Sequence, residues 1–164
     1  MPESDSQPEK PTQDRPLVLL TGATGYIGSR LLPLLEQRDV RVRCLARNPD
    51  KLRTQVAEST EIVKGDVLDR PSLDQTLSGV TTAYYLVHLM ASSANFEKQD
   101  REAAENFGAA AKEAGIQRII YMGGLGEETD PKLSPHLRSR HEVGKILRDS
   151  GVETIEFRTG NACC

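Results

Sequence analysis

The feature of this chain that points most directly to a chemical function is a set of three glycines spaced three residues apart, Gly22, Gly25 and Gly28. They join an unbroken apolar run at residues 17–20 to apolar residues that recur as on a helix at 27–35. A glycine turn between a buried strand and a helix lets backbone N–H groups approach a phosphate, which the positive end of the helix dipole stabilises. We therefore expect the diphosphate of a dinucleotide at this turn, with a purely structural turn as the alternative.

The end of the second predicted strand, residues 40–46, bears on which dinucleotide is bound. A ribose with a free 2′-hydroxyl is usually held there by an acidic side chain, whereas a 2′-phosphate calls for arginine. This chain has Arg47 at that place, Lys51 about one helical turn later, and no carboxylate at the end of the strand. We expect NADP(H), with NAD(H) and a merely solvated Arg47 left open as alternatives.

Further cofactor contacts are expected where other strands end, because ligands of open α/β sheets bind outside the carboxyl ends of the strands. Asp66 and Val67 are placed to hold the adenine, although Asp66 is equally suited to capping its own turn. His88, at the end of the fourth strand, has a place in the core as its alternative. The predicted cofactor-binding residues are Thr21, Gly22, Thr24, Gly25, Tyr26, Ile27, Gly28, Arg47, Asp66, Val67, Leu86, Val87 and His88.

The elements that must position these residues alternate between strand and helix. The patterns predict strands at 17–20, 40–46, 61–66, 80–87, 118–122 and 152–157, and helices at 27–35, 48–58, 70–79, 92–114 and 137–150. This alternation implies right-handed crossovers and helices on both faces of a parallel sheet. We predict a doubly wound α/β Rossmann fold with strand order 3-2-1-4-5-6 over residues 16–164, preceded by a disordered tail at 1–15.

Composition narrows the range of partners. The 164 residues suffice for one core, and a net charge of −3 offers no basic surface for nucleic acid. No apolar segment approaches the roughly 20 residues that cross a bilayer, and the amino-terminus lacks the pattern of a signal peptide. Cys44, Cys163 and Cys164 show neither metal-site spacing nor a disulfide framework. We expect a cytoplasmic protein that binds a small-molecule dinucleotide but no nucleic acid or metal, with a protein partner or homo-oligomer left open.

Several short motifs, taken as a set, resemble the atypical short-chain dehydrogenase/reductases. The similarity is greatest to NmrA-like and complex-I-subunit-like NAD(P)-binding proteins, often labelled nucleoside-diphosphate-sugar epimerases. The motifs are TGATGYIG at 21–28, LAR at 45–47, GDV at 65–67, YLVH at 85–88, YMGGLG at 121–126 and SPHLRSR at 134–140. The resemblance implies a Rossmann domain that binds NAD(P)(H), followed in full-length relatives by a smaller substrate-binding region. Because this chain stops at residue 164, we expect a member that lacks that region.

Catalysis is where the sequence departs from this family pattern. Ordinary short-chain dehydrogenases carry a Tyr-x-x-x-Lys pair on the helix after the fifth strand and a hydroxyl at the end of that strand. No tyrosine here has a lysine four residues later, and Gly123 and Gly124 stand where the hydroxyl is expected. His141 and Lys145 have the same offset, and an imidazole titrates near neutral pH. These two are the candidate catalytic pair, and a solvated helix face is the other interpretation, which the run of charged residues favours.

Two functions follow from these expectations. One is an NADP(H)-dependent oxidoreductase or epimerase-like enzyme with a degenerate catalytic set. The other is a non-catalytic module that senses NADP(H) or supports a complex. Turnover of the bound cofactor with carbonyl or quinone substrates would distinguish them.

Overall fold

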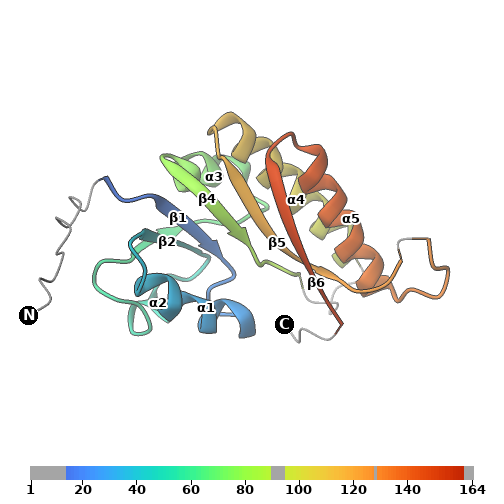
Figure 1. Ribbon diagram of the computed structural model, residues 1–164, viewed down its shortest axis with the longest axis horizontal. Helices are drawn as coiled ribbons and strands as arrows, with labels where there is room; N and C mark the ends of the chain where they lie inside the picture. The colour runs from blue at the N-terminus through green and yellow to red at the C-terminus, as the bar shows by residue number, and fades with distance from the viewer. Residues whose placement is uncertain (1–13, 90–94, 128, 161–164) are drawn as a thin grey trace, which may run out of the picture.

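A six-stranded parallel sheet forms the centre of the computed structural model, which describes residues 14–89, 95–127 and 129–160. Its strands are β1 (Leu17–Thr21), β2 (Arg41–Ala46), β3 (Glu61–Lys64), β4 (Val80–Tyr85), β5 (Arg118–Gly124) and β6 (Glu153–Thr159). The order across the sheet is β3-β2-β1-β4-β5-β6, with every neighbouring pair parallel. The predicted doubly wound Rossmann topology is confirmed (Figure 1).

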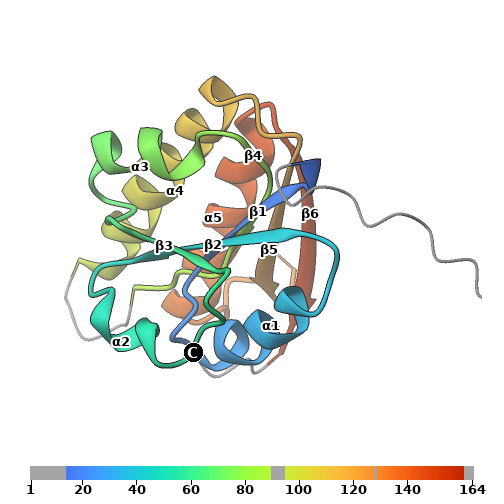
Figure 2. The same cartoon turned by 90° about the vertical axis from the view of Figure 1, so that its left-hand side faces the viewer.

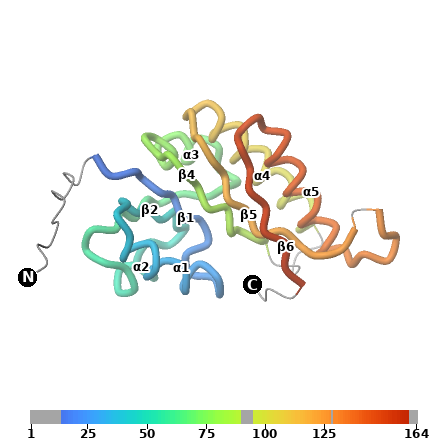
Figure 3. Tube along the Cα trace, in the orientation of Figure 1, coloured from blue at the N-terminus to red at the C-terminus, as the bar shows by residue number. Residues whose placement is uncertain are grey.

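Five helices of the described chain connect these strands: α1 (Tyr26–Glu36), α2 (Asp50–Arg53), α3 (Arg70–Leu77), α4 (Phe96–Glu113) and α5 (Pro135–Asp149). After β3 at one edge, the chain returns through α3 to β4 beside β1, as the trace in Figure 3 shows. The two halves of the sheet therefore diverge between β1 and β4. In open α/β sheets this switch point is where a ligand binds.

The helices form a layer on each face of the sheet, with α1 and α2 on one side and α3, α4 and α5 on the other (Figures 1 and 2). The residues of β1 alternate between the two layers, so that Leu17 and Leu19 join the core under α3, α4 and α5. Val18 and Leu20 join the core under α1 and α2. Burial on both faces accounts for the unbroken apolar sequence of this strand.

Several predicted boundaries are wrong; the strand predicted at 61–66, for example, ends at Lys64. Three of the differences have an identifiable cause. The helix expected over 48–58 is a single turn, α2, because Leu52 is its only buried side chain and nothing holds a longer apolar face. Residues 123–124, expected in a loop, extend β5 because β6 pairs with them as far as Thr159. The fourth strand ends at Tyr85, which leaves residues 86–88 as irregular chain.

Two further expectations fall largely outside the described residues. Only the last two positions of the tail predicted at 1–15 are among the described residues. The predicted start of the fourth helix, at Ser92, also lies outside them. No helix in the described part of the chain has the length and apolar character required to cross a membrane.

Candidate dinucleotide-binding site

The turn between β1 and α1 depends on two of its glycines. Gly22 has φ +69°, and a Cβ on it would lie 2.7 Å from the carbonyl oxygen of Leu86. A Cβ on Gly28 would lie 2.1 Å from the carbonyl oxygen of Gly22, so the helix can pack this closely only without a side chain there. The first N–H groups of α1 have no acceptor within the helix and face the end of the sheet. This backbone cradle fits a diphosphate.

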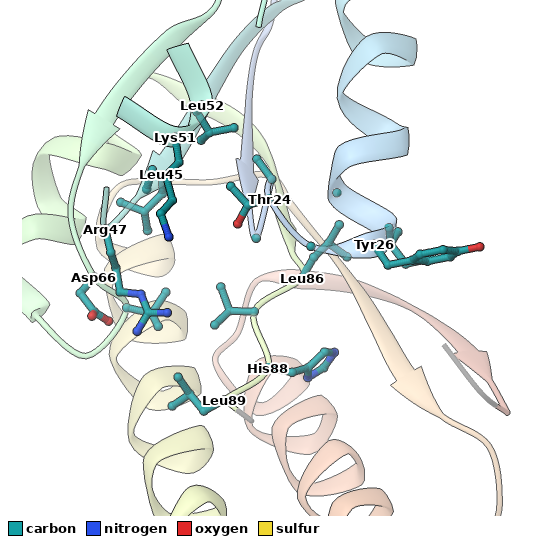
Figure 4. A pocket seen from close by; sticks show the side chains of 18 of the residues that line it. Thr24, Tyr26, Leu45, Arg47, Lys51, Leu52, Asp66, Leu86, His88 and Leu89 are labelled. Atoms are coloured by element: carbon teal, nitrogen blue, oxygen red, sulfur yellow. The ribbon is translucent and has the colours of Figure 1, made fainter. Parts of the chain in front are cut away.

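A pocket of about 620 Å³ lies above this turn, at the carboxyl ends of β1 to β5 (Figure 4). It is open over the point where the two halves of the sheet diverge. It is lined by Gly22, Ala23, Thr24, Gly25, Tyr26, Ile27, Gly28, Leu45, Ala46, Arg47, Asn48, Lys51, Leu52, Gly65, Asp66, Val67, Leu86, Val87, His88, Leu89, Met122 and Arg140. The pocket thus brings together every predicted cofactor-binding residue except Thr21.

Thr21 lies beneath the pocket and is fully buried. Its hydroxyl donates to the carbonyl oxygen of Tyr84 at 2.9 Å and accepts from the N–H of Leu86 at 3.0 Å. These bonds fasten the irregular segment after β4 to the end of β1. Thr21 therefore shapes the wall of the pocket from below rather than facing its interior.

One side of the pocket carries the charged residues expected at the adenosine end. Arg47 follows β2, Lys51 is on α2 and Asp66 follows β3, and Figure 4 shows all three on the same side. Asp66 Oδ1 accepts from the N–H of Leu68 at 3.0 Å, so this carboxylate caps its own turn while it lines the pocket. The turn-capping alternative and a pocket position are both realised by the same side chain.

The opposite end of the pocket contains His88 and a residue that the sequence reasoning did not select, Arg140 of α5. Arg140 is only 2% exposed, and its Nη2 donates to the carbonyl oxygen of Met122 at 3.1 Å. The same nitrogen lies 3.4 Å from Nε2 of His88. Because a guanidinium only donates, Nε2 is the acceptor and the proton of the neutral ring resides on Nδ1. Burial, followed by the charge of Arg140, lowers the pKa of His88 to about 3.

Buried polar groups hold this end in place. Asp100 of α4 is 4% exposed, and its two oxygens accept from the N–H of Leu89 at 2.9 Å and from the hydroxyl of Ser139 at 2.8 Å. The hydroxyl of Tyr121 donates to the carbonyl oxygen of Arg140 at 2.9 Å. The segment after β4, the helix α4 and the helix α5 are therefore tied together around Arg140.

The predicted catalytic residues lie elsewhere. His141 is 4% exposed, Lys145 is exposed, and both line a separate pocket of about 490 Å³ between α4 and α5. His136 instead lies beside the main pocket, with its ring 6.5 Å from that of His88. His136 and Arg140 share the four-residue offset of a Tyr-x-x-x-Lys pair, five residues before the pair that we predicted. That offset was the signal that could have found them.

Comparison with known proteins agrees with this geometry. A protein-family model described as NAD(P)H-binding matches residues 22–160. A Streptomyces griseus (4-alkanoyl-5-oxo-2,5-dihydrofuran-3-yl)methyl phosphate reductase is 30% identical over 136 residues, which cover 83% of this chain and 44% of that protein. An NmrA-like family domain-containing oxidoreductase, himF of Aspergillus japonicus, is 28% identical over 149 residues, which cover 85% of this chain and 44% of the relative.

Solved structures give the same picture. Citrobacter sp. triphenylmethane reductase complexed with NADP(H) superposes with a TM-score of 0.76 at 21% identity, over 87% of this chain and 48% of that one. The NADPH-dependent quinone oxidoreductase QOR2 of Escherichia coli, complexed with NADPH, gives a TM-score of 0.71 at 26% identity over the same shares. The chain spans about half the length of the proteins it matches. It belongs to the NAD(P)H-binding family of Rossmann-fold proteins, with NmrA-like oxidoreductases among its relatives.

Proposed function

We propose that this chain binds NADP(H) and forms the cofactor-binding half of an oxidoreductase. The observation that carries the proposal is the course of the pocket, which runs from Arg47 and Lys51, over the turn at Gly22, to His88 and Arg140. A dinucleotide laid across the switch point of such a sheet has its adenosine over one half and its nicotinamide over the other. The relative QOR2, which is NADPH-dependent, supports the same cofactor here.

Each part of the pocket has a proposed role in holding the cofactor. The backbone of the turn at 22–28 holds the diphosphate, and Arg47 and Lys51 bind the 2′-phosphate through charge-assisted hydrogen bonds. Asp66 and Val67 border the adenine. Leu86, Val87 and His88 lie along the nicotinamide half, and Thr21 keeps that segment in position.

A bound reduced nicotinamide supplies a hydride, and the chain must then orient the substrate and transfer a proton to it. Of the residues at that end, His88 is neutral and holds a proton on Nδ1. His136, half-buried beside it, is the second imidazole that can move a proton between the pocket and water. We propose His136, rather than His141 and Lys145, for proton transfer, because its ring lies 6.5 Å from that of His88, which lines the pocket and itself stays neutral.

The test of the cofactor assignment is the replacement Arg47→Ala. A charge-assisted hydrogen bond contributes about 1.5–3 kcal/mol, so the dissociation constant for NADPH should rise about 10- to 100-fold while that for NADH barely changes. Titration monitored by the fluorescence of the reduced nicotinamide measures both constants. Arg53→Ala is the matched control, because Arg53 is an exposed arginine near Arg47 that pairs with Asp50 and does not line the pocket.

A non-catalytic NADP(H)-sensing module remains the second candidate. It is favoured by one observation, namely that no tyrosine of the sequence is followed by a lysine four residues later. Incubation with NADPH and a quinone, followed by the absorbance of the reduced nicotinamide, separates the two functions. Steady oxidation of NADPH supports the enzyme, and stoichiometric binding without oxidation supports the module.

A further inference from the structure

Arg140 is a buried cation whose charge nothing in the described chain compensates. Its side chain is 2% exposed, and its two polar neighbours, the Met122 carbonyl oxygen and His88 Nε2, are uncharged acceptors. Its Nε is buried without a hydrogen-bond partner, and no carboxylate among the described residues forms an ion pair with it. Buried guanidinium groups are ordinarily paired, because removing a charge from water is costly.

The buried acids closest to this helix are already used by other groups. Both oxygens of Asp100 accept hydrogen bonds from Leu89 and Ser139. Glu156, on β6, forms ion pairs with Arg148 and Arg158. Nη2 uses its two N–H groups on the Met122 carbonyl oxygen and His88, and Nε is buried, so the two N–H groups of Nη1 are the ones left for a further acceptor in the pocket.

We propose that this end of the pocket is an anion site in which Arg140 binds a carboxylate of the substrate. The inference rests on the proposed function, which assigns the phosphates of the cofactor to the turn at 22–28 and to Arg47 with Lys51. With those phosphates assigned to other residues, the anion beside Arg140 comes from a second ligand. The two N–H groups of Nη1 can donate charge-assisted hydrogen bonds to a carboxylate, whose negative charge offsets that of the buried guanidinium. The substrate class is thus an organic acid that carries a reducible group.

The experiment titrates the NADPH-saturated chain with benzoate and, separately, with benzamide, its uncharged analogue of the same shape. Backbone amide NMR shifts report binding, and the Nε–H resonance of Arg140 reports the contact itself. Benzoate should bind with a dissociation constant of about 1 mM or below, and benzamide at least about 10-fold more weakly. If benzoate and benzamide bind equally well, or if neither of them binds, the proposal is overturned before any variant is made.

Variants then assign the effect to one side chain. Arg140→Met should weaken benzoate binding about 10- to 100-fold, and Arg140→Lys, which keeps the positive charge, should weaken it less. Arg138→Met is the control on the same helix, because Arg138 is exposed and does not line this pocket. Unchanged benzoate binding by a folded Arg140→Met chain refutes the assignment.

Two further outcomes keep this inference separate from the proposed function. If benzoate binds the free chain but NADPH displaces it, Arg140 holds a phosphate of the cofactor and the substrate site is refuted. If NADPH itself fails to bind, the proposed function fails, and the titration of the free chain still decides whether Arg140 forms an anion site.

Discussion

His88 should make the stability of this protein depend on pH in a predictable way. Its pKa in the folded chain is lowered from 6.5 to about 3, mainly by burial and then by the charges of Arg140 and His136. At pH 7.5 the imidazole is neutral in both states and contributes almost nothing. Below pH 6.5 the unfolded chain takes up a proton that the folded chain refuses, so stability is lost progressively until about pH 3. Linkage gives a loss of about 2 kcal/mol at pH 5.0.

The measurement is the free energy of unfolding in urea at pH 7.5 and pH 5.0, for the unaltered chain and for His88→Gln. Carboxylates titrate in both proteins, so the comparison between them isolates His88. The difference between the two pH values should be about 2 kcal/mol smaller in the variant. An equal pH dependence in the unaltered chain and in His88→Gln would refute the buried neutral imidazole.

Three other predictions follow from the structure. Gly28→Ala should lower the free energy of unfolding by about 1–3 kcal/mol and weaken NADPH binding at least about 10-fold. The reason is that the added Cβ would lie 2.1 Å from the Gly22 carbonyl oxygen, and normal stability and NADPH binding of the variant would contradict it. Thr21→Val should cost about 1–3 kcal/mol in urea unfolding, since it leaves the Leu86 N–H and the Tyr84 carbonyl unpaired, whereas an unchanged midpoint would count against that role. Burial raises the pKa of the Cys44 thiol to about 12, so Cys44 should react with a thiol reagent at pH 8 only at the rate of unfolding. Peptide mass spectrometry separates its labelling from that of Cys163 and Cys164, and fast labelling at Cys44 itself would contradict the buried thiol.

The sheet and the glycine turn were predictable because each depends on residues adjacent in sequence. The apolar run at 17–20 is typical of a strand buried on both faces, and the spacing of Gly22 and Gly28 indicates the turn that follows. The regular alternation of elements then leaves few topologies. For the same reason, nearly all the residues expected to line the pocket were identified from the positions where strands end.

The helix face at the other end of the pocket was not predictable in the same way. Successive residues of a helix point about 100° apart, so Arg140 faces the pocket while His141 faces the neighbouring helix. Choosing between them requires the packing of α5 on both β5 and α4, which is set by contacts such as Tyr121 to Arg140 and Asp100 to Ser139. Those contacts join residues 19 and 39 positions apart, beyond the reach of a local pattern.

The helix predicted at 48–58 is longer than the observed α2 for a related reason. The carboxylate of Glu36 accepts from the N–H of Ala57 at 2.8 Å and from the hydroxyl of Thr60 at 2.6 Å. These bonds hold the segment after α2 in an irregular path against the end of α1. A partner more than 20 residues away decided the local conformation, and propensity alone could not reveal it.

A crystal structure of this chain grown with NADPH tests the central claim most directly. The account predicts the diphosphate against the backbone of residues 22–28, the 2′-phosphate within hydrogen-bond distance of Arg47, and the nicotinamide beside His88. A dinucleotide bound elsewhere, or bound here in the reverse direction with its 2′-phosphate at Arg140, would contradict it.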